Sequence, residues 1–221
     1  MSAQIGLVTV TDPLSPVSEA YRALRVNLQF AALDRELYTL LIASPGPGEG
    51  KSTTLANLAV TMAQVEQQVL MVDCDLRRPQ LHALFGLDND AGLTNMLIDD
   101  QALKSPPLQE TGIAGLRLLP SGTLPTRPAD LLGSKRMERV IARLREEADI
   151  LLFDAPPIMV ATDAAILATK VDGVLLVFSA GETKRDHARR AIERLEKVRA
   201  HILGAVLNNA PLDETLRSYY G

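Results

Sequence analysis

The chain has 221 residues and a formal net charge of −4, and 47% of its residues are hydrophobic. This length fits one large domain or two small ones, with enough apolar residues for a sizeable core. The acidic balance and the lack of a basic block argue against a nucleic-acid partner. A single cysteine excludes an internal disulfide framework. No apolar run reaches the ~18 to 20 residues of a membrane span. We therefore expect a cytoplasmic chain.

The N-terminal segment predicts an extended arm followed by a helix. Residues 1–16 end in a proline-rich run, and each proline disfavours helix for the residue before it. Ser18 is a suitable N-cap for a helix of about residues 19–33. Every third position along the first half of this helix is charged: Glu19, Arg22 and Arg25. Spacing alone favours the simpler interpretation, in which these side chains form surface ion pairs of the i, i+3 type.

Residues 37–53, LYTLLIASPGPGEGKST, combine three elements in the order that a phosphate-binding loop requires. An apolar run predicts a buried strand, a loop of glycine and proline follows, and Gly50-Lys51-Ser52 opens a helical pattern. The N-terminus of a helix offers N–H donors and a favourable dipole to phosphate oxygens. Lys51 can reach the β- and γ-phosphates of ATP, and the Ser52 hydroxyl is placed to bind Mg²⁺. A tight turn with a chance Gly-Lys-Ser would not explain the strand and helix on either side.

The loop departs from the general pattern GxxxxGK[ST], because proline stands at position 45. Pro45 and Pro47 have no N–H group to donate. We therefore expect the phosphate donors to come from the rest of the loop and the first helical turn: Gly46, Gly48, Glu49, Gly50, Lys51, Ser52 and Thr53. Because a carboxylate is unsuited to face a triphosphate, we expect the side chain of Glu49 to point outward.

Two further apolar runs end in acidic residues. One leads into Asp73 and Asp75, and the other leads into Asp154. Open α/β sheets bind their ligands at the carboxyl ends of the strands. Carboxylates beside a phosphate loop are costly unless a cation balances them, so we expect Mg²⁺ here, with Asp154 next to Ser52. In the alternative, Asp73 and Asp75 only cap turns.

The remaining sequence predicts further strands and helices in alternation. Strands are expected at residues 116–120, 173–178 and 203–207, and helices at 80–85, 93–98, 134–148 and 184–200. This order implies right-handed crossovers and a mostly parallel sheet with helices on both faces. We therefore predict an α/β fold of the P-loop NTPase class. Asn208 follows the last strand and could bind a nucleotide base, although a turn role is equally consistent.

These motifs together resemble those of the bacterial tyrosine kinases that regulate capsule and exopolysaccharide synthesis and export. The resemblance covers nearly the whole chain and rests on four features: Pro47-Gly48-Glu49-Gly50-Lys51-Ser52, Asp73-Cys74-Asp75-Leu76-Arg77, Phe153-Asp154-Ala155-Pro156 and Glu19-x-x-Arg22-x-x-Arg25. It implies an ATP-dependent protein-tyrosine kinase, in which Lys51 and Ser52 bind the triphosphate and Mg²⁺ while Asp154 supports the metal. It also implies that Asp73 and Asp75 serve the metal or accept the tyrosine proton, and we prefer Asp73 as the base.

The resemblance further implies an assembly. In that family the Glu-x-x-Arg-x-x-Arg helix makes the subunit contacts of a ring, so we expect residues 17–33 to form an oligomerisation helix. This helix would belong to a single kinase domain, residues 17–212, followed by a tyrosine tail, residues 213–221. The chain ends Ser218-Tyr219-Tyr220-Gly221, a shorter cluster than is usual, and we expect Tyr219 and Tyr220 to be phosphorylated in trans. A membrane adaptor or polysaccharide co-polymerase protein would recruit the kinase to the inner face of the plasma membrane.

Two other classes of protein remain open. One is an ATPase switch of the MinD/ParA type, but those proteins carry an additional lysine early in the loop, where this chain has Gly46. They often end in an amphipathic membrane-binding helix as well, and the sequence after Asn209 is too short to predict one. The other class is a non-catalytic scaffold for a membrane export protein, gated by nucleotide.

Overall fold

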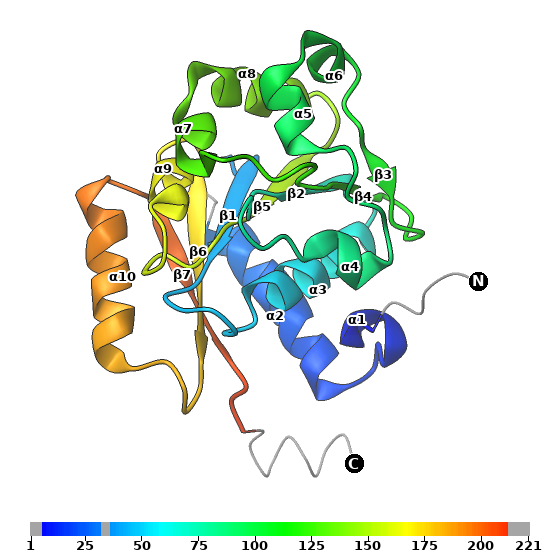
Figure 1. Cartoon of the computed structure of the whole chain (residues 1–221). Coiled ribbons are helices and arrows are strands. Elements are labelled where there is room, and N and C mark those ends of the chain that lie inside the picture. Colours follow the sequence, from blue (N-terminus) through cyan, green and yellow to red (C-terminus); the bar gives the residue numbers. More distant parts are fainter. Residues whose placement is uncertain (1–5, 32–35, 212–221) are drawn as a thin grey trace.

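A computed structural model describes residues 6–31 and 36–211, which form an α/β structure around a seven-stranded sheet (Figure 1). The strand order is β3-β4-β2-β5-β1-β6-β7. The strands are β1 (Thr39–Ala43), β2 (Val69–Asp73), β3 (Gln109–Glu110), β4 (Leu116–Leu119), β5 (Ile150–Asp154), β6 (Gly173–Ser179) and β7 (Ile202–Asn208). All neighbours pair in parallel except the short β3, which is antiparallel to β4. The mostly parallel sheet predicted from the sequence is confirmed.

Helices cover both faces of this sheet, as the alternating pattern predicts. They are α1 (Val8–Thr11), α2 (Pro16–Ala31), α3 (Lys51–Ala63), α4 (Leu81–Phe85), α5 (Leu93–Ile98), α6 (Asp100–Lys104), α7 (Pro128–Gly133), α8 (Lys135–Leu144), α9 (Asp163–Ala168) and α10 (Arg185–Lys197). Within the described residues, no helix has the length and apolarity needed to cross a lipid bilayer. The sequence did not predict α6, α7, α9 or β3, because elements this short hold too few periodic residues to be recognised.

The sheet separates two hydrophobic clusters, and β1 contributes to both. Leu40 and Ile42 pack with the residues of α2, α3 and α4 on one face. Leu41 and Ala43 pack with those of α5 to α10 on the other. Every residue of β1 is therefore buried, which explains why a strand covered on both faces has a continuous apolar sequence.

The N-terminal segment differs from the extended arm that the prolines predict. Residues 8–11 form one helical turn, and α2 begins at Pro16. Proline is accepted at the first position of a helix, because its missing N–H would have no partner there. Ser18 lies inside the first turn and is not its N-cap, and its hydroxyl donates to the carbonyl of Asp12 at 2.7 Å. The arm is held against α3 because Thr9 donates its hydroxyl to Asn57 Oδ1 at 2.8 Å.

Candidate active site

The carboxyl ends of three central strands and the N-terminus of α3 surround one hollow. Asp154, at the end of β5, pairs in register with Ile42 of β1 and with Asp73 of β2. The hollow has a volume of about 280 Å³ and is lined by Pro47, Gly48, Gly50, Lys51, Ser52, Thr53, Asp75, Arg78, Gln80 and Pro157. The structure thus brings the predicted phosphate loop and one of the predicted acidic loops to a single place.

Lys51 lies between the acidic side chains at the base of this hollow. Its Nζ is 3.1 Å from Asp154 Oδ1 and 3.5 Å from Asp75 Oδ2, and it donates to Ser52 Oγ at 3.1 Å. Burial lowers the pKa of Lys51, but the charges of Asp154 and Asp75 outweigh this, and the pKa lies above its usual value. Lys51 is therefore a permanent cation, and it neutralises carboxylates that would otherwise repel a triphosphate.

Asp154 has the chemistry of a magnesium ligand. The Ser52 hydroxyl donates to its Oδ2 at 2.5 Å. Its buried Oδ1 has no hydrogen-bond partner in the described structure, although Lys51 is close enough for an ion pair. Burial raises the pKa of Asp154, and the ion pair and hydrogen bond offset this only in part. A hard cation such as Mg²⁺ would satisfy both the serine oxygen and this carboxylate.

The described residues contain no group of three His, Cys, Asp or Glu side chains suited to hold a metal ion. A Mg²⁺ site does not need such a group, because Mg²⁺ usually keeps several water ligands and takes most of its other ligands from substrate phosphates. The residues present therefore fit Mg²⁺ bound together with a nucleotide.

Asp73 and Asp75 have different surroundings. Asp73 is fully buried, and its two oxygens accept the backbone N–H groups of Asp75, Gln80 and Leu81 at 3.0 to 3.1 Å. Burial and the charge of Asp154 raise its pKa to about 7. Asp75 turns its Oδ2 toward Lys51 and lines the hollow. Both aspartates thus cap the loop before α4, as in the alternative left open by the sequence, because Asp75 Oδ1 accepts the N–H groups of Arg77 and Arg78. Asp75 differs from Asp73 in that its Oδ2 faces the site.

Glu49 does not point outward as predicted. Its side chain is buried, with Oε2 accepting the N–H of Gly46 at 3.0 Å and Oε1 accepting the hydroxyl of Thr183 at 2.7 Å. The expectation failed because the loop after β6 supplies a partner for the carboxylate, and no local pattern reveals this. As a further consequence, the N–H of Gly46 is engaged within the loop itself.

Asn208, at the end of β7, packs directly on the phosphate loop. Its Nδ2 donates to the carbonyl of Glu49 at 3.3 Å. Gly50 has a φ of +86°, and a Cβ at this position would lie 2.0 Å from Asn208 Nδ2. Glycine is therefore favoured at position 50 by its backbone conformation, and a larger residue would also displace the side chain of Asn208. A role of Asn208 in binding the nucleotide base stays a prediction.

The loop after β2 is clamped to α9 by an ion pair that sequence reasoning missed. Arg77 places Nε 3.0 Å from Asp163 Oδ2 and Nη2 3.1 Å from Asp163 Oδ1. Asp163 is fully buried at the start of α9. Asp163 lies 86 residues from Arg77 along the chain, and no sequence pattern around either residue predicts that they pair.

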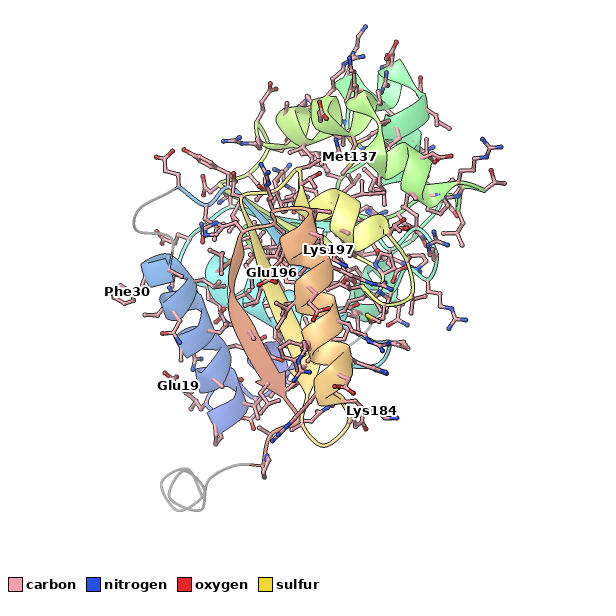
Figure 2. The ribbon with its side chains drawn as sticks, turned by 90° about the vertical axis from the view of Figure 1, so that its left-hand side faces the viewer. Glu19, Phe30, Met137, Lys184, Glu196 and Lys197 are labelled. Atoms are coloured by element: carbon pink, nitrogen blue, oxygen red, sulfur yellow. The ribbon has the colours of Figure 1, made fainter. Side chains whose placement is uncertain are left out.

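The charged row on α2 lies outside the hollow. Glu19 is exposed, and its Oε2 accepts from Arg22 Nη1 at 2.9 Å. Arg22 also donates to the carbonyl of Pro13, while the buried Nε of Arg25 has no hydrogen-bond partner in the described structure. Figure 2 shows Glu19 and the exposed Phe30 on the outer side of α2. Tyr219 and Tyr220 lie outside the described residues.

The sheet order, the glycine loop leading into α3 and the acidic strand ends define a P-loop NTPase. A model of this class, described as ParA: NUBPL iron-transfer P-loop NTPase, matches residues 37–213. The fold class predicted from the sequence is confirmed.

Similar proteins narrow the class to a family. Tyrosine-protein kinase YwqD of Bacillus subtilis (strain 168) is 40% identical over 219 residues, which cover 99% of this chain and 92% of that protein. Putative tyrosine-protein kinase CapB of Staphylococcus aureus is 35% identical over 94% of this chain and 91% of its own. The kinase domain of the Escherichia coli tyrosine kinase ETK superposes with a TM-score of 0.90 at 32% identity, over 97% of this chain and 84% of that domain. The chain belongs to the bacterial tyrosine-kinase family, so the predicted family and enzyme class are confirmed.

Proposed function

We propose that this kinase transfers the γ-phosphoryl group of ATP to Tyr219 or Tyr220 of a neighbouring copy of the chain. Through this reaction it regulates the synthesis and export of capsular or extracellular polysaccharide. The observation that carries the proposal is the convergence of Lys51, Asp75 and Ser52 on one hollow at the N-terminus of α3. Nearly full-length relatives named tyrosine-protein kinases support the choice of acceptor.

The nucleotide would bind with its phosphates over the first turn of α3. Since the Glu49 side chain occupies the N–H of Gly46, the remaining backbone donors for the phosphate oxygens are those of Gly48, Glu49, Gly50, Lys51, Ser52 and Thr53. Lys51 exchanges its contacts with Asp75 and Asp154 for the β- and γ-phosphates. Ser52 and Asp154 would hold Mg²⁺, which would supply positive charge to the phosphates. Asn208, next to Gly50, contributes to the binding of the base.

In the transfer step, the tyrosine oxygen forms a new bond to the γ-phosphorus. The bond from that phosphorus to the bridging oxygen breaks, and ADP leaves with the electron pair. The phenolic proton goes to a carboxylate of the loop after β2. Our preference from the sequence was Asp73, but both of its oxygens accept backbone N–H groups. The contacts favour Asp75, because it lines the hollow and only its Oδ1 accepts backbone N–H groups, which leaves Oδ2 facing the site. In either case the loose transition state makes positioning and electrostatics the main contributions.

Transfer between subunits needs an assembly, and α2 supports one. Glu19 and Phe30 are exposed on its outer side, and Arg22 is held beside Glu19 by their ion pair. We propose that Glu19, Arg22 and Arg25 contribute to a ring of subunits. A membrane adaptor or polysaccharide co-polymerase then holds the ring at the inner face of the plasma membrane.

Two other functions are compatible with the same hollow. An ATPase switch of the MinD/ParA type would hydrolyse ATP to control dimerisation, but its additional lysine is absent because residue 46 is glycine. A nucleotide-gated scaffold would bind ATP without transferring the phosphoryl group. The sequence identity to proteins named tyrosine-protein kinases favours the kinase over the ATPase switch and over the scaffold.

Incubation with Mg-ATP separates these functions. Mass spectrometry should find phosphate on Tyr219 or Tyr220 of the wild-type chain and none on a Lys51→Met variant. Hydrolysis of ATP without phosphotyrosine would contradict the proposal in favour of an ATPase switch. Binding of ATP without either reaction would point to the scaffold.

A further inference from the structure

The loop after β2 carries two neighbouring arginines with different surroundings. The guanidinium of Arg77 is engaged by the buried carboxylate of Asp163 through two hydrogen bonds. Arg78 is exposed and lines the hollow of the phosphate loop. Among the described residues, no acidic side chain forms an ion pair with Arg78. The second arginine is therefore a cation at the site whose charge the fold does not use.

Hydrogen bonds hold the backbone of this loop around Arg78. Two carboxylates accept five of its backbone N–H groups, those of Asp75, Arg77, Arg78, Gln80 and Leu81. The N–H of Arg78 itself donates to Asp75 Oδ1 at 2.9 Å. With Arg77 clamped to α9 as well, the backbone of Arg78 is fixed beside the hollow before any substrate binds. A backbone held in this way limits the rearrangement that Arg78 needs to reach the phosphates, which is an advantage in catalysis.

The charges around the hollow indicate what Arg78 would bind. Its lining contains two cations, Lys51 on α3 and Arg78 on the loop after β2. Lys51 lies deep in the site, where it contacts Asp154 and Asp75. During phosphoryl transfer, negative charge is spread over the three outer oxygens of the moving group, so a cation on a second element would add to the charge that Lys51 and Mg²⁺ supply. A guanidinium on a second element matches two phosphate oxygens at once.

We propose that Arg78 is a catalytic residue that contacts the γ-phosphoryl group while it is transferred. This inference rests on the proposed kinase function and adds a residue to it. Arg78 donates hydrogen bonds to the oxygens of the moving group and is unchanged by the reaction. The new bond still joins the tyrosine oxygen to phosphorus, ADP keeps the electron pair of the broken bond, and the proton goes to Asp75. Arg77 is a positioning residue, since it acts by holding the loop.

The test compares Arg78→Met and Arg78→Lys with a control, Arg190→Met, which removes an exposed arginine of α10. Phosphotyrosine formation and ATP hydrolysis are both measured, because water and tyrosine accept the same phosphoryl group. Calorimetry gives the affinity for Mg-ADP and for a non-hydrolysable Mg-ATP analogue. Circular dichroism and the urea midpoint verify that each variant folds.

We expect Arg78→Met to lower kcat by about a hundredfold or more, in the range seen for single preorganised donors. The affinity for Mg-ADP should change less than about twofold, because ADP lacks the group that Arg78 contacts. The affinity for the ATP analogue should fall relative to the affinity for Mg-ADP. Arg78→Lys should restore part of kcat, since a lysine keeps the charge but not the planar pair of donors. Arg190→Met should match the wild type.

Other results would overturn the inference. A higher KM for the acceptor with kcat unchanged would mean that Arg78 recognises the acceptor peptide. Equal losses of affinity for ADP and for the ATP analogue would mean that Arg78 contacts the α- or β-phosphate, which both nucleotides carry. A wild-type chain that makes no phosphotyrosine would contradict the proposed function instead, and ATP hydrolysis or analogue preference would then still decide the contact of Arg78.

Discussion

Lys51 and Asp154 face each other at the base of the hollow, with Nζ 3.1 Å from Oδ1. The same aspartate accepts the hydroxyl of Ser52, so the predicted phosphate and metal ligands form one charged cluster before any substrate binds. Under the proposed function, binding of Mg-ATP would exchange contacts within this cluster. The charge of the lysine would move from the carboxylates to the phosphates, and Asp154 would hold the metal.

The first prediction concerns this lysine. Lys51→Met should weaken the binding of Mg-ATP by roughly 1.5 to 3 kcal/mol, the size of a lost charge-assisted contact. Calorimetric titration measures the affinity, and circular dichroism verifies the fold. Lys184→Met, which removes an exposed lysine just before α10, is the matched control and should leave the affinity unchanged. An unchanged affinity in the Lys51 variant would mean that the loop does not bind the triphosphate as proposed.

The second prediction separates the two aspartates after β2. Asp75→Asn should lower kcat, because it removes the carboxylate that faces Lys51 while its amide oxygen can still accept from the loop. Asp73→Asn replaces one acceptor oxygen by an NH₂ group that faces backbone donors, and should lower the free energy of unfolding by roughly 1 to 3 kcal/mol. Urea denaturation and turnover are measured for both variants. If Asp73→Asn loses turnover but keeps its full stability, Asp73 and not Asp75 is the general base.

The third prediction concerns the partly buried contact between Glu49 and Thr183. Together they join the phosphate loop to the loop after β6 through a hydrogen bond of 2.7 Å. A double-mutant cycle with Glu49→Ala and Thr183→Val should give a coupling energy of roughly 1 to 2 kcal/mol in urea denaturation. Thr126→Val, at an exposed threonine, is the control for the threonine change and should show no coupling to Glu49→Ala. Additive effects at positions 49 and 183 would show that the contact contributes nothing to stability.

The fourth prediction tests the assembly. Replacing Glu19, Arg22 and Arg25 together with alanine should reduce the mass measured by light scattering, while circular dichroism stays unchanged. Because Arg25 lines a pocket together with Leu28 and Met62, a Glu19→Ala, Arg22→Ala variant that leaves Arg25 intact is measured in parallel. If the wild type is a monomer with and without Mg-ATP, the row is a solvated surface and the ring is excluded.

The fifth prediction concerns transfer between subunits. Nine residues follow Leu212, and fully extended they cover about 30 Å, enough to approach a neighbouring site. A Lys51→Met chain with intact tyrosines is mixed with an active chain carrying Tyr219→Phe and Tyr220→Phe. We expect phosphate on the inactive chain. If only the unmixed wild type is phosphorylated, transfer occurs within one subunit.

Each phosphate adds about −1.5 to −2 charges. Two modified tyrosines would therefore nearly double the net charge of −4, and we expect them to leave the acidic site and weaken the assembly. Light scattering before and after phosphorylation measures this effect.

The sequence by itself determined the elements whose signals are local. The apolar run of β1, the glycine loop and the start of α3 are contiguous, and each residue type there follows from phosphate chemistry or backbone conformation. The acidic ends of β2 and β5 were found in the same way, because a parallel sheet brings the carboxyl ends of its strands to one edge.

Only the tertiary structure decided how the side chains around this site are used. The inward turn of Glu49, the capping by Asp73 and the engagement of Arg77 all depend on partners supplied by packing. Asn208 lies 159 positions from Glu49, and the pattern of either residue alone carries no information about the other. Buried polar groups must find partners wherever the fold places them, so these roles are set by three-dimensional proximity. The same proximity left Arg78 as the cation beside the hollow whose charge the described fold does not use.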